Sequence, residues 1–360
     1  MLPHMRAARL CLALLLGACG SRSGLSSPPA ETTDADAGGS GGGAGAGGSA
    51  GSGGGAGAGG TPSCAFGAEP VTLAAGISRA YAIAVDEAFV FVTSAVDGGE
   101  LLRIPKAGGP ALALLTGLGR PRHLALDAER VWVTSPMDGR VLAATKDGAA
   151  VQQIVAASPG HPAGIARAGT TTVWVRQGPG VKGGALFAWE PESVAPTLLA
   201  SGLDSPGALV VSEGHAFWID NTTGNTPGIW HFAPATTAVP QLLAPLPAAN
   251  GNDLALDDSH VYYAMNAEVG RVHRDGGARQ VLSSGAFAHG VALGGPHLYW
   301  VEGGATSSGR LARVPRAGGS VETLATGLVV PRDVALDEAC VYWTNQGVGD
   351  ASGSVMARAR

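Results

Sequence analysis

The chain has 360 residues, including 57 Gly and 23 Pro, and a formal net charge of -5. Only 14% of its residues are charged and 5% are aromatic, which argues against a helical bundle and favours an all-β or a disordered chain. The mild acidity gives no electrostatic indication of nucleic-acid binding. We therefore expect no nucleic-acid partner.

The N-terminal residues have the pattern of an export signal. Arg6 and Arg9 precede the apolar run 10–16, and Leu16-Gly17-Ala18-Cys19 ends that run in small residues. The run is too short to span a bilayer. The four closing residues resemble the lipobox of bacterial lipoproteins, in which the signal is removed and the Cys is acylated. The pattern predicts a signal peptide over residues 1–18 and lipidation of Cys19, with an ordinary secretory cleavage site as the alternative.

The resemblance to lipoproteins implies a place in the bacterial cell envelope, with the membrane reached through the lipid anchor. Gly20 stands where an Asp is associated with inner-membrane retention, which favours the outer membrane, on its periplasmic or surface side. Each buried methylene of the acyl chains contributes about 0.8 kcal/mol to anchoring. No transmembrane helix is then required.

Residues 19–63 form a low-complexity segment, in which 17 of the 57 glycines lie between Gly20 and Ser63. Such a composition has too few apolar side chains to form a core. The segment is expected to be a flexible tether with a root-mean-square span of roughly 35–40 Å.

The remaining residues, 64–360, repeat one unit seven times. Each unit has a short apolar strand that ends in Asp or a substitute, followed by a strand with an aromatic residue, as in Leu124-Ala125-Leu126-Asp127 and Val131-Trp132-Val133-Thr134. The positions equivalent to Asp127 are 41, 41, 44, 45, 37 and 43 residues apart: Asp86, Asp127, Ala168, Ser212, Asp257, Gly294 and Asp337. The aromatic positions are Phe91, Trp132, Trp174, Phe217, Tyr262, Tyr299 and Tyr342.

A third strand such as 310–315 and a fourth such as 321–325 complete each unit. Four short strands in about 42 residues are typical of a β-propeller blade. A single blade cannot cover both of its apolar faces, so blades stack around an axis and the aromatic residues fill the gaps between them. The predicted fold is an all-β, seven-bladed propeller with four antiparallel strands per blade. Six blades are the alternative if the weak third repeat, around Ile165, is not a true blade.

The seventh repeat ends before its fourth strand. Residues 69–76 read like the fourth strand at 321–327, so the N-terminal strand is predicted to close the last blade and to remove exposed sheet edges. Cys11 leaves with the signal and Cys19 carries lipid, which leaves Cys64 and Cys340 in this same blade. We predict a disulfide between them in an oxidising compartment, with two buried free thiols as the alternative.

The runs Pro331-Arg332-Asp333-Val334-Ala335-Leu336-Asp337 and Val341-Tyr342-Trp343-Thr344-Asn345, with a hairpin at 314–319, resemble YWTD-type and NHL-type propellers. They are most similar to the secreted and lipid-anchored propeller proteins common in myxobacteria. The resemblance covers residues 69–360. It implies the propeller fold, whereas related propellers include protein-binding modules, lyases and lactonases. We expect a non-catalytic binding or interaction module. One alternative is a propeller enzyme, either a lyase or a lactonase-like hydrolase, that acts on a small anionic substrate. Another is a structural component of the envelope.

Propeller ligands usually bind where the innermost strands begin. Four and five residues before the Asp127-type positions, polar side chains gather in repeats two, five, six and seven: Arg122, His123, Asn252, Asp253, His289, Arg332 and Asp333. The two arginines suit a carboxylate or phosphate, and a His beside an Asp suits acid-base chemistry. The expected partner is an envelope or extracellular protein or a small anionic ligand, bound by a monomer. Solvated ion pairs and strand caps are the alternative explanation of these residues.

No metal and no cofactor is predicted. A calcium or magnesium site of the lactonase kind needs a cluster of Glu, Asn and Asp, and the ring supplies Asn252, Asp253 and Asp333 without a Glu. A lyase of the virginiamycin-inactivating kind would pair a His with a Glu, and His289 has no Glu in repeat register. The sequence also contains no His-Glu-x-x-His or Cys-x-x-Cys pattern.

Overall fold

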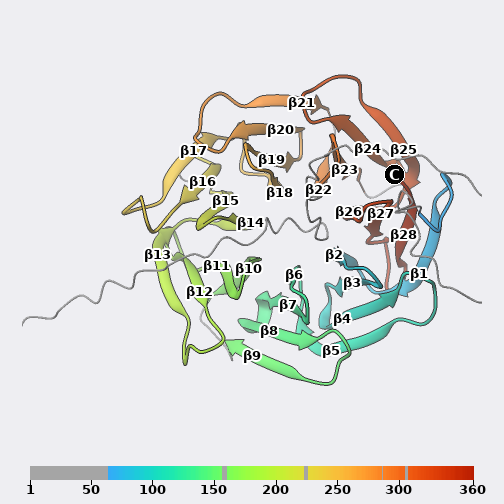
Figure 1. Ribbon diagram of the computed structural model, residues 1–360, viewed down its shortest axis with the longest axis horizontal. Coiled ribbons are helices and arrows are strands. Elements are labelled where there is room, and N and C mark those ends of the chain that lie inside the picture. Colours follow the sequence, from blue (N-terminus) through green and yellow to red (C-terminus); the bar gives the residue numbers. More distant parts are fainter. Residues whose placement is uncertain (1–63, 156–159, 223–225, 286, 305–306) are drawn as a thin grey trace, which may run out of the picture.

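The computed structural model describes residues 64–155, 160–222, 226–285, 287–304 and 307–360. These residues form seven four-stranded antiparallel sheets around a central axis (Figure 1). The protein is a seven-bladed β-propeller, and its third repeat is a complete blade, so the six-bladed alternative is wrong. The predicted signal peptide over residues 1–18, lipidated Cys19 and the tether to residue 63 lie outside the described residues. Within the described ranges, no helix is long and apolar enough to cross a membrane.

Each blade places one strand at the axis and one at the rim (Figure 1). The innermost strands are β2 (Ala80–Val85), β6 (His123–Leu126), β10 (His161–Ala168), β14 (Pro206–Ser212), β18 (Gly251–Leu256), β22 (Ala288–Gly294) and β26 (Pro331–Leu336). The second strands are β3 (Phe89–Ser94), β7 (Arg130–Ser135), β11 (Thr171–Gln177), β15 (His215–Asp220), β19 (His260–Met265), β23 (His297–Glu302) and β27 (Cys340–Asn345). We number the blades 1 to 7 by their innermost strands in chain order.

The outer half of each blade consists of a third and a fourth strand. The third strands are β4 (Asp97–Pro105), β8 (Arg140–Thr145), β12 (Gly184–Trp189), β16 (Gly228–Phe232), β20 (Glu268–His273), β24 (Gly309–Pro315) and β28 (Gly353–Ala359). The rim strands are β5 (Leu112–Gly119), β9 (Val151–Val155), β13 (Thr197–Leu203), β17 (Gln241–Pro245), β21 (Gln280–Ser284), β25 (Glu322–Leu328) and β1 (Val71–Ile77). A short 3-10 turn, η1 (Pro136–Asp138), follows β7.

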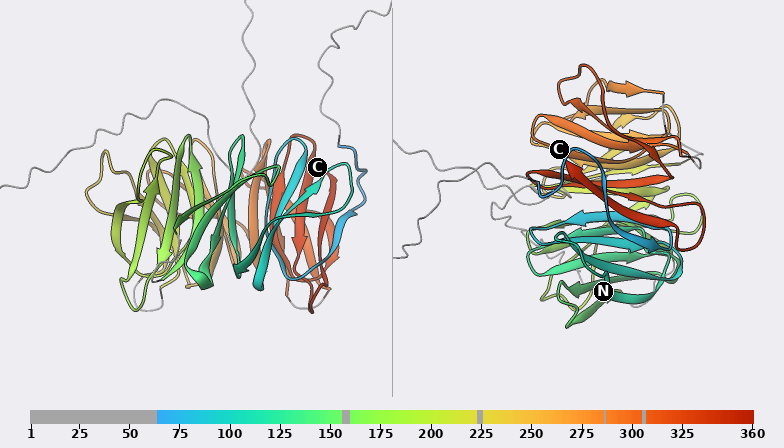
Figure 2. Two further views of the ribbon diagram at one scale, coloured as in Figure 1. Left: turned by 90° about the horizontal axis from the view of Figure 1, so that it is seen from below. Right: turned by 90° about the vertical axis from the view of Figure 1, so that its right-hand side faces the viewer.

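Viewed from the side, the propeller is a disc whose strands run between its two faces (Figure 2). The innermost strands begin on one face, which we call the mouth face, and end on the other, which we call the far face. The residues four and five positions before each Asp127-type position therefore lie on the mouth face. The Asp127-type positions themselves lie on the far face.

Apolar side chains fill the gap between each pair of neighbouring blades. Seven clusters of buried residues each combine side chains of two adjacent blades. Between blades 6 and 7, for example, Tyr299 belongs to one cluster with Val334 and Trp343, and all three are at most 1% exposed. The predicted role of the aromatic positions is confirmed, because burial of this area between blades is what holds a propeller ring together.

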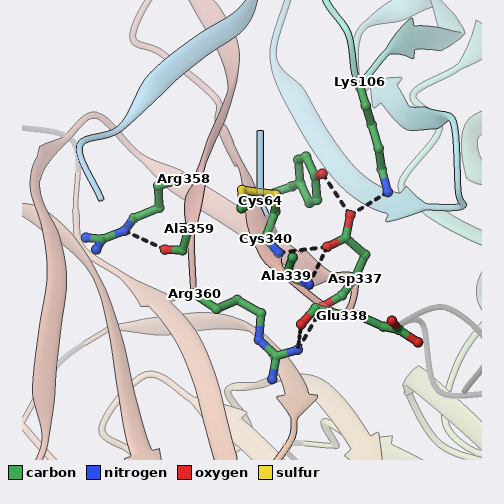
Figure 3. Close-up of a disulfide and its surroundings, with 10 residues drawn as sticks. Cys64, Lys106, Asp337, Glu338, Ala339, Cys340, Arg358, Ala359 and Arg360 are labelled. Atoms are coloured by element: carbon green, nitrogen blue, oxygen red, sulfur yellow. Dashed lines mark hydrogen bonds and ion pairs between the residues drawn. A yellow bond between two sulfur atoms is a disulfide. The ribbon is translucent and has the colours of Figure 1, made fainter. Parts of the chain in front are cut away.

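The N-terminal strand closes the last blade as predicted. Strand β1 pairs antiparallel with β28, and Val71 lies opposite Ala357. Beside this strand pair, Cys64 and Cys340 form a disulfide with their Cα atoms 5.2 Å apart (Figure 3). Both ends of the described chain are therefore tied into one sheet.

The aspartates of the repeat organise the far face. One carboxylate oxygen of Asp337 accepts hydrogen bonds from the backbone N–H groups of Ala339 and Cys340, and the other accepts from Tyr342 Oη at 2.8 Å and from Lys106 Nζ of blade 1 at 2.6 Å (Figure 3). Burial raises the pKa of Asp337, but these hydrogen bonds and the charge of Lys106 outweigh it and lower the pKa below its usual value. Ion pairs join neighbouring blades at three other positions. Lys146 pairs with Asp86 and Arg316 with Asp257, and both cations follow a third strand as Lys106 does; Arg167 of β10 pairs with Asp127.

Removal of the Asp337 carboxylate is expected to destabilise the ring closure more than removal of its cation does. Asp337→Ala leaves two backbone N–H groups and the Tyr342 hydroxyl without their acceptor, which should cost about 2–3 kcal/mol. Lys106→Met removes one partly buried ion pair, for which we expect a loss of about 1 kcal/mol. Urea denaturation of the two variants measures both losses, and equal losses would contradict this assignment.

Candidate functional site

The predicted polar residues meet in one cavity at the mouth of the propeller. It has a volume of about 40 Å³ and is lined by Tyr81, Arg122, His123, Asn252, Asp253, His289, Gly290, Arg332 and Asp333. All seven residues proposed from the repeat register are among them. Blades 3 and 4 add nothing to the lining; there the inner strands pack closely, and a Cβ atom on Gly164 would fall against the backbone of Gly207.

Two arginines from blades 2 and 7 lie over the ring of Tyr81 from blade 1. The guanidinium carbons of Arg122 and Arg332 are 5.7 and 5.8 Å from its centroid, within the range of cation–π attraction. Arg332 also donates a hydrogen bond from Nε to the side-chain oxygen of Gln346. Across the part of the chain that the structure describes, neither guanidinium forms an ion pair with a carboxylate. Among the described residues, both guanidinium groups therefore lack an ion-paired carboxylate, although Asp253 and Asp333 line the same cavity.

The two aspartates of the cavity join neighbouring blades through the main chain. Asp253 in blade 5 accepts a hydrogen bond from the backbone N–H of Val291 in blade 6 at 3.1 Å, and Asp333 in blade 7 accepts one from Ile83 in blade 1 at 3.0 Å. Their exposed fractions are 4% and 5%. Both carboxylates thus bind the backbone of the next blade, so the strand-cap explanation holds for them.

Asn252 also links two blades. Its Nδ2 donates to Asn266 Oδ1 at 2.9 Å within blade 5 and to the carbonyl of Ala288 in blade 6 at 2.6 Å. The amide is therefore fixed beside the cavity. His123 lines the cavity next to Arg122, and these two are the lining residues from blade 2. The backbone carbonyl of His123 lies 3.5 Å from the hydroxyl of Thr134.

His289 is neutral at physiological pH. Burial and the nearby charge of Arg332 lower its pKa to about 4, against an opposing hydrogen bond to the backbone of Gly303. Burial and the charges of Arg79 and Arg122 likewise lower the pKa of Arg332. Both shifts include repulsion between cations, so Arg332 lies close enough to Arg122 and to His289 for their charges to interact.

This geometry suits an anionic group more than a metal or a large ligand. Drug-sized ligands fill pockets of roughly 300–1,000 Å³, whereas a space of about 40 Å³ accommodates a few water molecules or one carboxylate or phosphate group. Among the residues the structure covers, no group of three or more His, Cys, Asp or Glu is arranged to hold a metal ion. The potential ligands Asp253 and Asp333 already accept backbone hydrogen bonds.

Two residues of the site were missed at the sequence level. Tyr81 has the same position in its repeat as Arg122 and Arg332 have in theirs, so the repeat pattern places it at the mouth. A single aromatic residue at that position does not indicate that two arginines lie over its ring. Gln346 follows the second strand of blade 7 and carries no repeat signal. Its contact with Arg332 depends on the packing of the loop after β27.

Comparisons with known proteins find similarity of fold. No protein-family model matches the chain, and no curated protein matches it. One similar solved structure is Ycf48 from Cyanidioschyzon merolae, with a TM-score of 0.60 and 12% identity over 81% of this chain and 98% of that chain. Another is a gluconolactonase from Xanthomonas campestris, with a TM-score of 0.52 and 15% identity over 81% and 89%.

A chain of a nidogen/laminin complex is also similar, with a TM-score of 0.51 and 20% identity over 63% of this chain and 89% of that chain. Identities this low establish the propeller architecture alone. The similar structures include an enzyme and a protein–protein complex, so function has to be argued from the site.

Proposed function

We propose that this protein is a non-catalytic binding module that captures a small anionic ligand, or an anionic group on an envelope or extracellular protein, at the propeller mouth. The observation that carries the proposal is the pair of guanidinium groups, Arg122 and Arg332, which lie over Tyr81 and form no ion pair with any carboxylate of the described residues. Guanidinium groups bind carboxylates and phosphates with two parallel hydrogen bonds. The small cavity limits the bound part of the ligand to one such group.

The N-terminal sequence supports an envelope location for this module. An acyl chain on Cys19 would hold the protein at the bacterial outer membrane, and residues 19–63 would let a monomeric propeller reach partners within tens of Å of that membrane. A rigid disc on a flexible tether has a raised local concentration near other envelope components. This arrangement suits the binding of a partner rather than the catalytic turnover of a substrate.

The enzymatic alternative, a lyase or lactonase-like hydrolase, has less support from the site. A general base works best with a pKa near the operating pH, and the pKa of His289 is about 4. Asp253 and Asp333 accept backbone hydrogen bonds from neighbouring blades. The gluconolactonase similarity, at 15% identity, indicates only that the fold can carry such chemistry.

Loss of either mouth arginine is expected to weaken anion binding. By isothermal titration with phosphate and with acetate, Arg122→Gln and Arg332→Gln should each raise Kd about tenfold or more, because each removes a charge-assisted hydrogen-bonding group. His123→Gln should change Kd less than about threefold. Arg120→Gln is the matched control, since Arg120 is nearby in sequence but forms an exposed ion pair with Asp97.

The opposite order of effects would contradict the proposal. If His123→Gln and His289→Gln abolish a hydrolytic or lyase activity while the arginine variants retain it, the protein is an enzyme. If none of the four mouth variants changes anion binding, the mouth is not the binding site.

A further inference from the structure

The far face contains one position where the repeat has lost its carboxylate but kept the groups that would bind it. In blades 5 and 7 the Asp accepts a hydrogen bond from a tyrosine of the second strand and from a cation of the next blade. Blade 6 has Gly294 at the Asp position, while Tyr299 occupies the tyrosine position. Arg360 occupies the cation position, since its backbone N–H donates to Ala339 as that of Lys106 donates to Ala88.

Other substituted blades have compensated for the loss. In blade 3 the Asp is replaced by Ala168, and the matching cation of blade 4 is replaced by Ala233, so neither charge remains. In blade 4 the Asp is replaced by Ser212, and the cation Arg274 pairs instead with Glu213 at 3.5 Å. At the blade 6–7 junction, by contrast, the cation is present and its acid is not.

Among the described residues, the side chain of Arg360 contacts uncharged groups there. Its Nη1 donates to the carbonyls of Asp337 at 2.8 Å and Glu338 at 3.0 Å (Figure 3), and its guanidinium lies 5.7 Å from the ring centroid of Tyr299. Its Nη2 occupies the space next to Gly294, 2.6 Å from where a Cβ atom would lie. No carboxylate within the described ranges forms an ion pair with it.

The surroundings add positive charge to this junction. Arg313 donates a hydrogen bond to the Tyr299 hydroxyl at 3.2 Å, although its own charge is partly offset by an ion pair with Glu322 at 2.8 Å. Burial and the charges of Arg313, Arg360 and Arg316 lower the pKa of His297, while Glu322 opposes them. An added negative charge at this place would therefore be stabilised.

We infer that the space bounded by Gly294, Tyr299 and Arg360 is a second anion site, on the far face, that takes a carboxylate group supplied from outside the chain. The carboxylate replaces the missing Asp side chain: it accepts hydrogen bonds from the Tyr299 hydroxyl and from Arg360, whose flexible end withdraws from the space beside Gly294. This inference does not depend on the function proposed for the mouth.

The test is to supply the carboxylate either within the chain or from solution. The backbone of Gly294 has no positive φ, so Asp and Asn are both allowed there, and Gly294→Asn reproduces the size of Gly294→Asp without its charge. Gly294→Asp should have a Tm about 2 °C or more above that of Gly294→Asn. On the Arg122→Gln/Arg332→Gln background, which removes formate binding at the mouth, sodium formate at constant ionic strength should raise the Tm of the parent protein and leave that of Gly294→Asp unchanged.

Two controls make the result decisive. The first is the Arg122→Gln/Arg332→Gln background itself, and the second is Arg360→Gln on that background, in which the formate response should be lost. The inference is overturned if Gly294→Asp is no more stable than Gly294→Asn. It is also overturned if, on this background, formate raises the Tm of the parent protein, Gly294→Asp and Arg360→Gln alike, because that is an adventitious ion effect only.

Discussion

Replacement of Cys64 and Cys340 by serine is expected to lower the free energy of unfolding by about 3–5 kcal/mol. The disulfide joins residues 276 positions apart, so its loss greatly increases the conformational freedom of the unfolded chain. It also releases the segment that precedes β1, which otherwise packs against the last blade through Cys64 and Phe66. Guanidinium denaturation of the oxidised wild type and of the double variant measures the difference.

Reduction of the wild type provides the matched comparison. Dithiothreitol should bring the wild type to the stability of the Cys64→Ser/Cys340→Ser variant and should leave that variant unchanged. Identical denaturation midpoints for oxidised and reduced wild type would show that the bond contributes nothing to the ring closure.

Stability is expected to fall as the pH is lowered from about 6.5 to about 4, in part because of His289. Its pKa is lowered from 6.5 in the unfolded chain to about 4 in the folded protein, so in this window the unfolded state binds more protons than the folded state. Unfolding is then favoured by acid. A shift of this size corresponds to roughly 3 kcal/mol at full effect.

His289→Asn separates this contribution from that of other histidines. Burial also lowers the pKa values of His215, His231 and His260. These residues therefore also make stability depend on pH in the same window, both in the wild type and in the variant. Denaturation midpoints measured at several pH values should fall less steeply with acid for His289→Asn than for the wild type. Parallel curves for the two proteins would mean that His289 titrates normally.

The repeat register predicted most of the candidate site for a physical reason. Equivalent positions in a ring of blades meet at the axis, so Arg332 of the last blade and Arg122 of the second were expected to approach each other although they are far apart in sequence. The same register identified the closing strand and, with the cysteine count, the Cys64–Cys340 bond. These features follow from symmetry and need no knowledge of side-chain packing.

The roles of the individual residues could not be predicted in this way. Asp333 was a candidate for acid-base or ligand chemistry, but its carboxylate accepts the backbone N–H of Ile83, a contact set by the spacing between two blades. Tyr81 supports two arginines that come from the blades on either side of it. Which side chain binds the neighbouring blade and which remains available to a ligand depends on distances of a few tenths of an ångström, and a one-dimensional pattern does not contain them.

A crystal of the protein soaked in sodium bromide and measured at the bromine absorption edge would test the anion-binding function most directly. We predict an anomalous peak in the mouth cavity within about 3–4 Å of the guanidinium groups of both Arg122 and Arg332, at the distances of charge-assisted contacts to an anion. That peak should be absent from crystals of the Arg122→Gln/Arg332→Gln variant. A mouth that holds only water, or in which both arginines are paired with carboxylates of the chain itself, would contradict anion capture as the function of this propeller.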